Sequence, residues 1–426
     1  MKFLTKVKEK FKSIGPGFIT GAADDDPSGV ATYSIAGAQY GYKLNFLTLF
    51  LLPAMVVIQS MCGRIGMLTG MGLAGNIRKY YSVKLAWFSV ILLIIANVIN
   101  IGADLGIMAA SLNMLFGWNI EISLILVACV IALLEIFIPY KNYSGYLKWL
   151  GLSLLVYVAT AFYVKQDWVE IFKNLIIPHI EFKVEYFMTV VGMLGTTISP
   201  YLFFWQTSEE VEQEIVENKI QDFGELPKET RKDVNRMNFD TLVGMGFSNL
   251  MTFFIIITTA ATLHANGIFS IETPQQAAMA LKPLAGNLAY FLFAFGIIGI
   301  GLQAIPVLAG SVAYGMAELL NMDEGLSKKF SQAKGFYIIL ALATLFGTLL
   351  NFIGVNTIQA LYYAAIVNGV IAVPLIAIII KLSGDKRVTG KFKFGTISKI
   401  IAWLTFVFML LAVILMIGSM FLPKLP

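Results

Sequence analysis

The sequence is poor in cysteine, histidine and charge, and each scarcity excludes a class of site. Its 426 residues include only two cysteines and two histidines. Cys62 and Cys129 lie in or beside apolar runs, and they offer neither a disulfide framework nor the CxxC spacing of a thiolate metal site. Two histidines are too few for an imidazole-built zinc site. Because no nucleophile motif, histidine-centred acid–base set or phosphate-binding loop is present, we expect neither an enzyme nor a bound cofactor.

Charged residues make up 13% of the chain, whereas 58% of the residues are hydrophobic. One protein core cannot bury that much apolar surface, so a lipid bilayer must surround much of the chain. Apolar stretches of about 18 residues or more mark membrane helices, and we count about eleven. The expected spans are 14–41, 45–63, 85–113, 119–139, 146–164, 186–206, 237–262, 286–317, 335–352, 357–381 and 400–422. The chain is therefore predicted to be an all-α polytopic membrane protein.

The 31 lysines and arginines are distributed unevenly among the connections between these spans. With the N-terminus in the cytoplasm, the positive residues left outside are Lys43, Lys165, Lys173, Lys183, Lys282 and Lys424. Cytoplasmic loops of membrane proteins carry an excess of positive charge, so this orientation is favoured. It also explains the net charge of +5 without a nucleic-acid partner. We expect a multi-pass protein of the cell inner (plasma) membrane, as a monomer or a homodimer.

The longest hydrophilic stretch, 207–236, mixes both signs of charge. We expect it to form a solvated cytoplasmic helix and turn. The alternative is that it forms a gate element beside a moving helix.

Acidic residues interrupt the first span, where three consecutive aspartates end at Asp26 and are followed by Pro27-Ser28-Gly29. Three carboxylates that faced lipid would be very costly, and the proline removes a backbone donor. Opened backbone at membrane depth is tolerated only where it lines a cavity. We therefore predict a helix broken near the membrane midplane with Asp26 at the break. The alternative is that Asp26 only caps the second half-helix.

The sixth span contains a second interruption, where Gly195-Thr-Thr-Ile-Ser precedes Pro200. Taken alone, this pattern also fits an ordinary proline kink. However, two interrupted spans five helices apart are typical of transporters built from inverted repeats, whose site lies at the midplane. We expect the whole chain, 1–426, to form a single transporter domain. Its repeats would cover about 14–164 and 186–381, with an extra helix at about 400–422.

These motifs resemble the NRAMP family of divalent-metal transporters. The similarity rests on Gly15-Pro-Gly-Phe, on Asp26-Pro-Ser-Gly, on the segment from Gly195 to Pro200, and on Ala103-Asp104 through Phe116. It runs over nearly the whole chain. The resemblance implies a LeuT-like 5+5 inverted-repeat fold with broken helices 1 and 6. It also implies proton-coupled uptake of manganese or iron.

The positions that bind metal in this family are altered here. The family's aspartate falls on Asp26, but its asparagine falls on Gly29. The residue that offers a backbone carbonyl falls on Thr196, and the methionine whose sulfur binds metal falls on Ser199. A thioether favours softer ions such as manganese and iron, whereas magnesium prefers oxygen ligands. The small side chains of Gly29 and Ser199 also predict a larger pocket. A larger pocket with only oxygen ligands resembles the NRAMP-related magnesium transporters.

The family's proton route is altered as well. Its two histidines fall on Tyr201 and Gln206, and its acidic pair in the third span falls on Ile101 and Asp104. We therefore expect transport of Mg²⁺, with Mn²⁺ as a further possible ion, without proton coupling. Two alternatives stay open. In the first, the same fold carries a non-metal solute or an anion. In the second, the protein performs standard proton-coupled uptake of manganese or iron.

The predicted site has two parts. Asp26, Thr196 and Ser199 are expected to bind the metal ion, which is the substrate. The predicted substrate path contains Asp25, Gly29, Asp104, Tyr201, Gln206 and Asn368.

Overall fold

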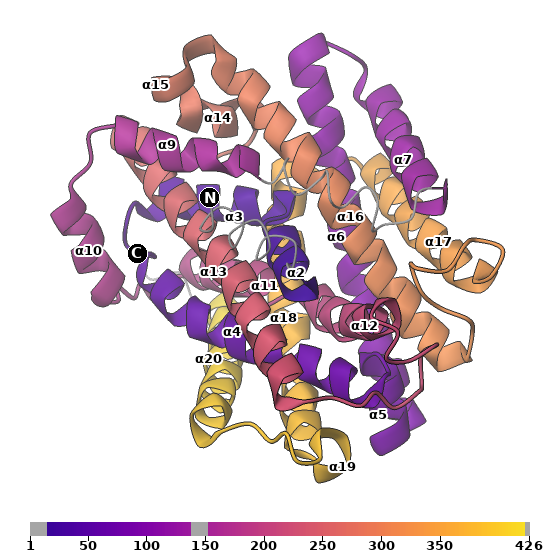
Figure 1. The fold of residues 1–426 in the computed structure, drawn as a ribbon. Helices are drawn as coiled ribbons and strands as arrows, with labels where there is room; N and C mark the ends of the chain where they lie inside the picture. The colour runs from indigo at the N-terminus through magenta and orange to yellow at the C-terminus, as the bar shows by residue number, and fades with distance from the viewer. Residues whose placement is uncertain (1–14, 138–151, 422–426) are drawn as a thin grey trace, which may run out of the picture.

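The computed structural model describes residues 15–137 and 152–421, which form helices joined by short connections and contain no β-strand (Figure 1). The basic segment 1–14 and the predicted cytoplasmic residues Lys141 and Lys148 lie outside the described residues.

Eight helical segments within these ranges are long and apolar enough to cross a membrane. They contain α4 (Phe46–Thr69), α6 (Val83–Phe116), α11 (Val184–Thr197) with α12 (Pro200–Val216), α13 (Arg231–Thr262), α16 (Ala289–Leu320), α17 (Lys334–Leu350), α18 (Thr357–Gly384) and α20 (Thr396–Phe421). The other predicted spans correspond to α2 (Pro16–Asp24) with α3 (Pro27–Tyr40), to α7 (Ile120–Phe137) and to α9 (Leu155–Tyr163). Shorter helices connect them: α5 (Leu73–Tyr80), α10 (Trp168–Ile176), α14 (Pro274–Ala278), α15 (Lys282–Ala285) and α19 (Lys386–Thr389).

Both predicted breaks are present, and local chemistry explains each of them. Between α2 and α3, Asp25 leaves helical geometry (φ −82°, ψ 53°) and Asp26 is extended. Pro27 then begins α3, because the first residue of a helix needs no N–H donor. Between α11 and α12, Ile198 and Ser199 depart in the same way before Pro200 begins α12. The two interrupted helices lie against each other, since α2 contacts α12 and α3 contacts α11.

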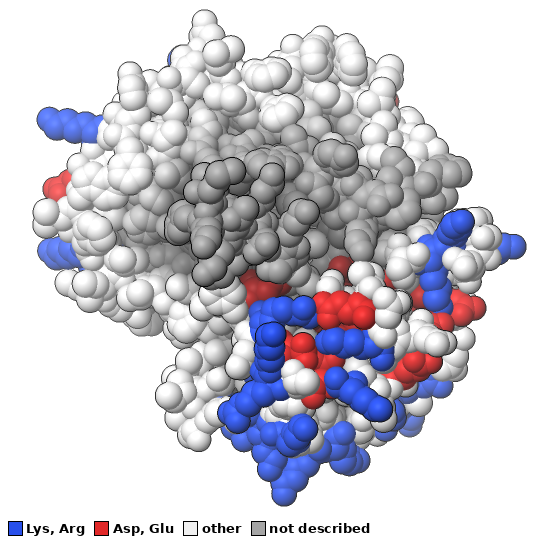
Figure 2. All heavy atoms as spheres, in the orientation of Figure 1, with Lys and Arg blue, Asp and Glu red and all other residues white. Residues whose placement is uncertain are grey.

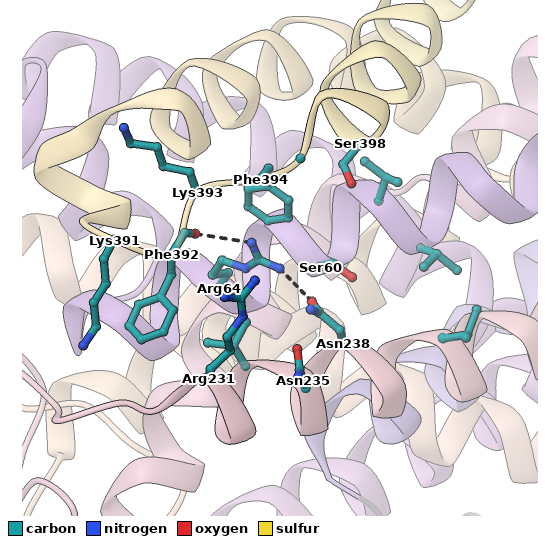
Figure 3. A pocket seen from close by; sticks show the side chains of 15 residues that line it. Ser60, Arg64, Arg231, Asn235, Asn238, Lys391, Phe392, Lys393, Phe394 and Ser398 are labelled. Carbon is teal, nitrogen blue, oxygen red and sulfur yellow. Dashed lines mark hydrogen bonds between the residues drawn. The ribbon is translucent and has the colours of Figure 1, made fainter.

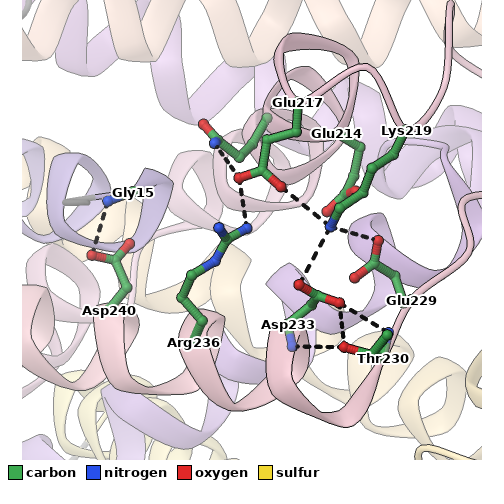
Figure 4. Close-up of polar contacts among 10 residues, drawn as sticks. Gly15, Glu214, Glu217, Lys219, Glu229, Thr230, Asp233, Arg236 and Asp240 are labelled. Atoms are coloured by element: carbon green, nitrogen blue, oxygen red, sulfur yellow. Dashed lines mark hydrogen bonds and ion pairs between the residues drawn. The ribbon is translucent and has the colours of Figure 1, made fainter. Parts of the chain in front are cut away.

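The helix α2 packs on α13 through glycines. A Cβ atom added to Gly21 would lie 2.2 Å from the carbonyl carbon of Gly244, so the two backbones approach too closely for any side chain. At the start of α2, the Asp240 carboxylate accepts a hydrogen bond from the backbone N–H of Gly15 at 3.1 Å (Figure 4). It accepts a second one from the backbone N–H of Gly17 at 2.8 Å. Asp240 thereby caps α2 from a neighbouring helix.

Charged side chains on the visible face gather at one end of the molecule, around α5, α19 and the connection from α12 to α13 (Figure 2). The prediction of a solvated segment at 207–236 is wrong for its first third. This part continues α12, and Glu210, Glu212 and Glu214 on it are buried between helices. At the end of α12, Lys219 contacts Glu214 and Glu229, each at 2.9 Å (Figure 4).

Candidate functional site

Asp26 lies buried at the first break and receives three hydrogen bonds. Its Oδ1 atom accepts from the backbone N–H of Gly29 and from the Ser28 hydroxyl, both at 2.7 Å. Its Oδ2 atom accepts from the Asn100 amide of α6 at 2.8 Å. Asp26 therefore does cap the second half-helix, which was the alternative to a binding role, but the cap uses only one oxygen. The other oxygen is held by a different helix, which the capping role alone does not explain.

Thr196 and Ser199 lie at the second break, and Thr196 reaches the first. The hydroxyls of Ser28 and Thr196 are 3.4 Å apart, which joins the two breaks directly. Ser199 donates its hydroxyl to the carbonyl oxygens of Gly195 (2.6 Å) and Thr196 (3.0 Å), so its proton is used within the end of α11. The lone pairs of the Ser199 oxygen remain available to coordinate a cation.

Gly29 brings α3 close to Thr196. A Cβ atom at Gly29 would lie 3.1 Å from the Thr196 hydroxyl oxygen and 3.3 Å from the Tyr33 ring. Glycine in place of the family's asparagine was expected to leave space in the pocket. The close approach of α3 and α11 fills part of that space. A larger pocket at this position is not seen in this conformation.

Asp25 points away from Asp26. The Ser248 hydroxyl of α13 lies 2.5 Å from Asp24 Oδ2 and 3.0 Å from Asp25 Oδ1, so both carboxylates face α13. One oxygen of each, Asp24 Oδ1 and Asp25 Oδ2, is buried and has no hydrogen-bond partner in the described parts of the chain. The first break therefore presents acids to two sides, with Asp26 toward α6 and Thr196, and the other two toward α13.

The residues predicted on α6 and α18 lie beside Asp26. The Asn368 amide of α18 is 3.5 Å from Asn100 Oδ1, and Asn100 in turn holds Asp26. Asp104 is fully buried one turn further along α6, in the electrostatic field of Asp26. Neither of its carboxylate oxygens forms a well-formed hydrogen bond with any described residue. A polar chain thus runs from α18 through α6 to the first break.

Tyr201 and Gln206 occupy different surroundings on α12. The Tyr201 hydroxyl donates to the carbonyl oxygen of Ala23 at 3.0 Å, which ties the start of α12 to the last turn of α2. Gln206 lies further from the break, where its amide donates to the Glu210 carboxylate at 2.7 Å. The structure therefore brings Tyr201 to the site and places Gln206 beside a second buried acid.

The donors around the two breaks are carboxylate, hydroxyl, amide and backbone oxygens. Within residues 15–137 and 152–421, no group of three or more His, Cys, Asp or Glu side chains is arranged to hold a metal ion. A cation at the breaks would therefore depend on Asp26 together with neutral oxygen atoms. Hard cations such as Mg²⁺ and Ca²⁺ take this kind of ligand.

Besides Asp24, which belongs to the aspartate run itself, three residues at the breaks were not on the predicted list: Ser28, Asn100 and Ser248. Two of them had a signal in the sequence. Ser28 follows Asp26-Pro27, the position from which a hydroxyl reaches back to a capping aspartate. Asn100 precedes Asp104 by four residues, so both lie on one face of α6. Ser248 lies on α13 more than 220 residues from Asp24, and nothing local marks it.

Comparisons with known proteins agree on the architecture. The family model "Natural resistance-associated macrophage protein-like" (Nramp) matches residues 17–419. The divalent metal cation transporter MntH of Brucella suis is 27% identical over 70% of this chain, and the match spans 65% of that protein's own length. The protein of the same name from Yersinia enterocolitica is 28% identical over 72% of this chain and 73% of its own.

Two solved structures show the fold. The Eremococcus coleocola manganese transporter, bound to an aromatic bis-isothiourea substituted compound, superposes with a TM-score of 0.74 at 17% identity, over 96% of this chain and 86% of that one. MhsT in complex with L-phenylalanine gives 0.64 at 10% identity, over 95% and 98%. The predicted all-α, LeuT-like fold with broken helices 1 and 6 is confirmed, and the protein is a multi-pass membrane protein.

Proposed function

Because the chain belongs to the Nramp family, we propose that it carries a divalent metal cation across the plasma membrane. The named functions of the MntH relatives support a divalent cation as the substrate. We propose further that the N-terminus is cytoplasmic and that the repeats cover about 14–164 and 186–381. The relatives are transporters, which supports a protein that moves its substrate without chemical conversion.

The proposed ion site consists of Asp26, Thr196 and Ser199. The proposal rests on Asp26, the charged residue at the first break. Its hydrogen-bond partner Ser28 also lies beside Thr196 at the second break, so Asp26 is close to both breaks. The ligands around it are oxygen atoms, and the position that carries a thioether in the family is a serine. Oxygen ligands favour Mg²⁺, and they also accept Mn²⁺. The half-helix starting at Pro27 has the positive end of its dipole here, but Asp26 would repel an anion.

Proton coupling is proposed to be lost. Tyr201 holds its hydroxyl proton against the Ala23 carbonyl, and Gln206 cannot titrate. The proposed path contains Asp25, Gly29 and Asp104 together with Tyr201, Gln206 and Asn368. A membrane potential of 100 mV gives a dication about 4.6 kcal/mol, which drives uptake without protons.

The Mn²⁺ alternative rests on the solved manganese transporter that shares the fold. Calorimetric titration of the purified protein with Mg²⁺ and with Mn²⁺ separates the two ions. We expect Asp26→Asn to weaken binding of either ion at least tenfold, since it removes the charge (about 1.4 kcal/mol or more). Glu121→Gln, at an exposed position on α7, is the matched control. Absence of binding of both ions at millimolar concentration would overturn the proposal.

Coupling is tested in proteoliposomes that contain a pH-sensitive dye and carry an imposed inside-negative potential. We expect Mg²⁺ to enter without a change of internal pH. Acidification of the lumen that requires the added metal ion would contradict transport without protons. The same measurement with Mn²⁺ distinguishes an ion-specific effect from a general one.

A further inference from the structure

A second site lies away from both breaks, in a cavity of about 760 Å³ between α4, α13 and the segment that leads into α20 (Figure 3). Arg64 enters it from α4 and Arg231 from the start of α13. Lys391 and Lys393 line it from the connection between α19 and α20. Among the described residues, four charged side chains line the cavity, and all four are basic.

Arg64 is the buried member of this group, with 8% of its surface exposed. Its guanidinium lies over the Phe394 ring at 3.6 Å and donates to the Phe392 carbonyl oxygen (3.3 Å) and to Asn238 Oδ1 (3.1 Å) (Figure 3). Its Nε atom has no hydrogen-bond partner among the described residues. No described Asp or Glu side chain forms an ion pair with Arg64. A buried cation without a counter-charge is costly, so the cavity favours an anion.

Neutral groups and helix ends add to this preference. Asn235 and Ser398 also line the cavity and offer hydrogen-bond donors. Both α13 and α20 begin beside it, and the start of a helix carries partial positive charge. On the other side the lining becomes apolar, with Val56, Val57 and Leu242. Leu242 is 47% exposed, so this side is open to the surroundings of the helices.

We infer that this cavity binds a phosphate group, held by Arg64 and by the surrounding lysines and Arg231. Arginine binds phosphate through two parallel hydrogen bonds, and each terminal nitrogen of Arg64 keeps one N–H beyond those that bind Phe392 and Asn238. The phosphate could come from an anionic lipid headgroup or from a soluble phosphate. The site lies between membrane-spanning helices at the charged end of the molecule, and the apolar lining suits an acyl chain. The lipid is therefore the favoured source. This inference does not depend on which ion the protein carries.

The test uses the full-length protein, freed of lipid in a neutral detergent, and measures retained lipid by native mass spectrometry. One arm adds phosphatidylglycerol, a second adds phosphatidylcholine, and a third titrates inorganic phosphate by calorimetry. We expect one phosphatidylglycerol to bind about tenfold more tightly than phosphatidylcholine. Phosphate binding in the third arm would assign the site to soluble phosphate as well, which also supports an anion site.

Variants locate the binding. Arg64→Gln is expected to weaken phosphatidylglycerol binding about tenfold. The double variant Lys391→Gln/Lys393→Gln changes only exposed side chains and keeps the test valid if the Arg64 variant fails to fold. Lys232→Gln removes the same charge next to Arg231, at an exposed position that does not line the cavity, and should have no effect. Equal binding of both lipids with no phosphate binding, or equal loss in the Lys232 variant, would overturn the inference.

Discussion

Buried carboxylates need hydrogen-bond donors, and the three aspartates at the first break find them in different directions. Asp26 uses Gly29, Ser28 and Asn100, whereas its two neighbours share the single hydroxyl of Ser248. Asp26 and its local partners can be predicted from the sequence, because a capping aspartate before proline is a local pattern. The Asn100 and Ser248 contacts depend on how distant helices pack, which the sequence pattern does not specify.

Removing the Ser248 hydroxyl should destabilise the protein. Ser248→Ala leaves both Asp24 and Asp25 without this donor, and we expect a loss of about 1–3 kcal/mol, measured as a lower thermal unfolding midpoint in detergent. Ser123→Ala on α7 is the control, because no described residue forms a hydrogen bond with the buried Ser123 hydroxyl. Equal midpoints for the two variants would show that the shared hydroxyl contributes nothing.

At the scale of helices, the breaks were predictable and their packing was not. Each break follows from prolines and small residues that are contiguous in sequence. The close approach of α2 and α13 joins Gly21 to Gly244, and neither glycine stands out among the 37 in the chain. The prediction for 207–236 failed in its first third for a related reason. Its charged residues suggested solvent, but α12 continues and buries its glutamates against neighbouring helices.

The contact between α2 and α13 can be tested with matched glycine variants. Gly21→Ala places a Cβ atom against the Gly244 backbone, which cannot move aside, so we expect α2 to be displaced at a cost of about 1–3 kcal/mol. Gly246→Ala on α13 meets nothing within 4 Å and gains only helix propensity. Thermal unfolding midpoints compare the two. A Gly21 variant as stable as the Gly246 variant would argue against the close packing.

The connection between α12 and α13 depends on Lys219, which contacts Glu214 and Glu229. Burial alone would lower the pKa of Lys219, but the Glu229 and Glu214 carboxylates outweigh it and raise the pKa above the ordinary 10.5. We expect Lys219→Gln to destabilise the protein by about 1–2 kcal/mol, less than for a fully buried pair because Lys219 is 22% exposed.

The pH dependence of this effect has a defined sign. Because folding raises the pKa of Lys219, its contribution is fully present below the unfolded pKa and is lost as the pH rises through the folded value. The difference in unfolding midpoint between the wild type and Lys219→Gln should therefore persist from neutral to mildly alkaline pH. A difference that disappears near pH 8 would contradict the ion-pair explanation.

For the whole molecule, hydropathy predicted the membrane spans and the distribution of charge predicted their orientation. About eleven spans were expected, and the helices of the structure fall on all of them. Charged side chains gather at one end, as the uneven lysine and arginine distribution requires (Figure 2). Sequence patterns specify which segments are buried in lipid, because that depends on composition. They do not specify which helices become neighbours, and the cavity around Arg64 joins three segments far apart in the chain.

The proposed orientation can be tested by thiol labelling of intact cells. In a Cys129→Ser background, which removes the exposed cysteine, we expect Lys386→Cys to react only after the membrane is permeabilised. Asn287→Cys, between α15 and α16, should react with an impermeant reagent from outside. Both positions are exposed. The reverse pattern would place the N-terminus outside.

The glycine contact between α2 and α13 also bears on how easily the first half-helix can move. Two helices joined by interlocked side chains must unpack many groups before they separate, whereas Gly21 and Gly244 touch backbone to backbone. The hydrogen bonds that fix the start of α2 come from Asp240, which is only partly buried, so water can replace them. We therefore expect separation to start at the Gly15 end of α2 and to advance toward the aspartates.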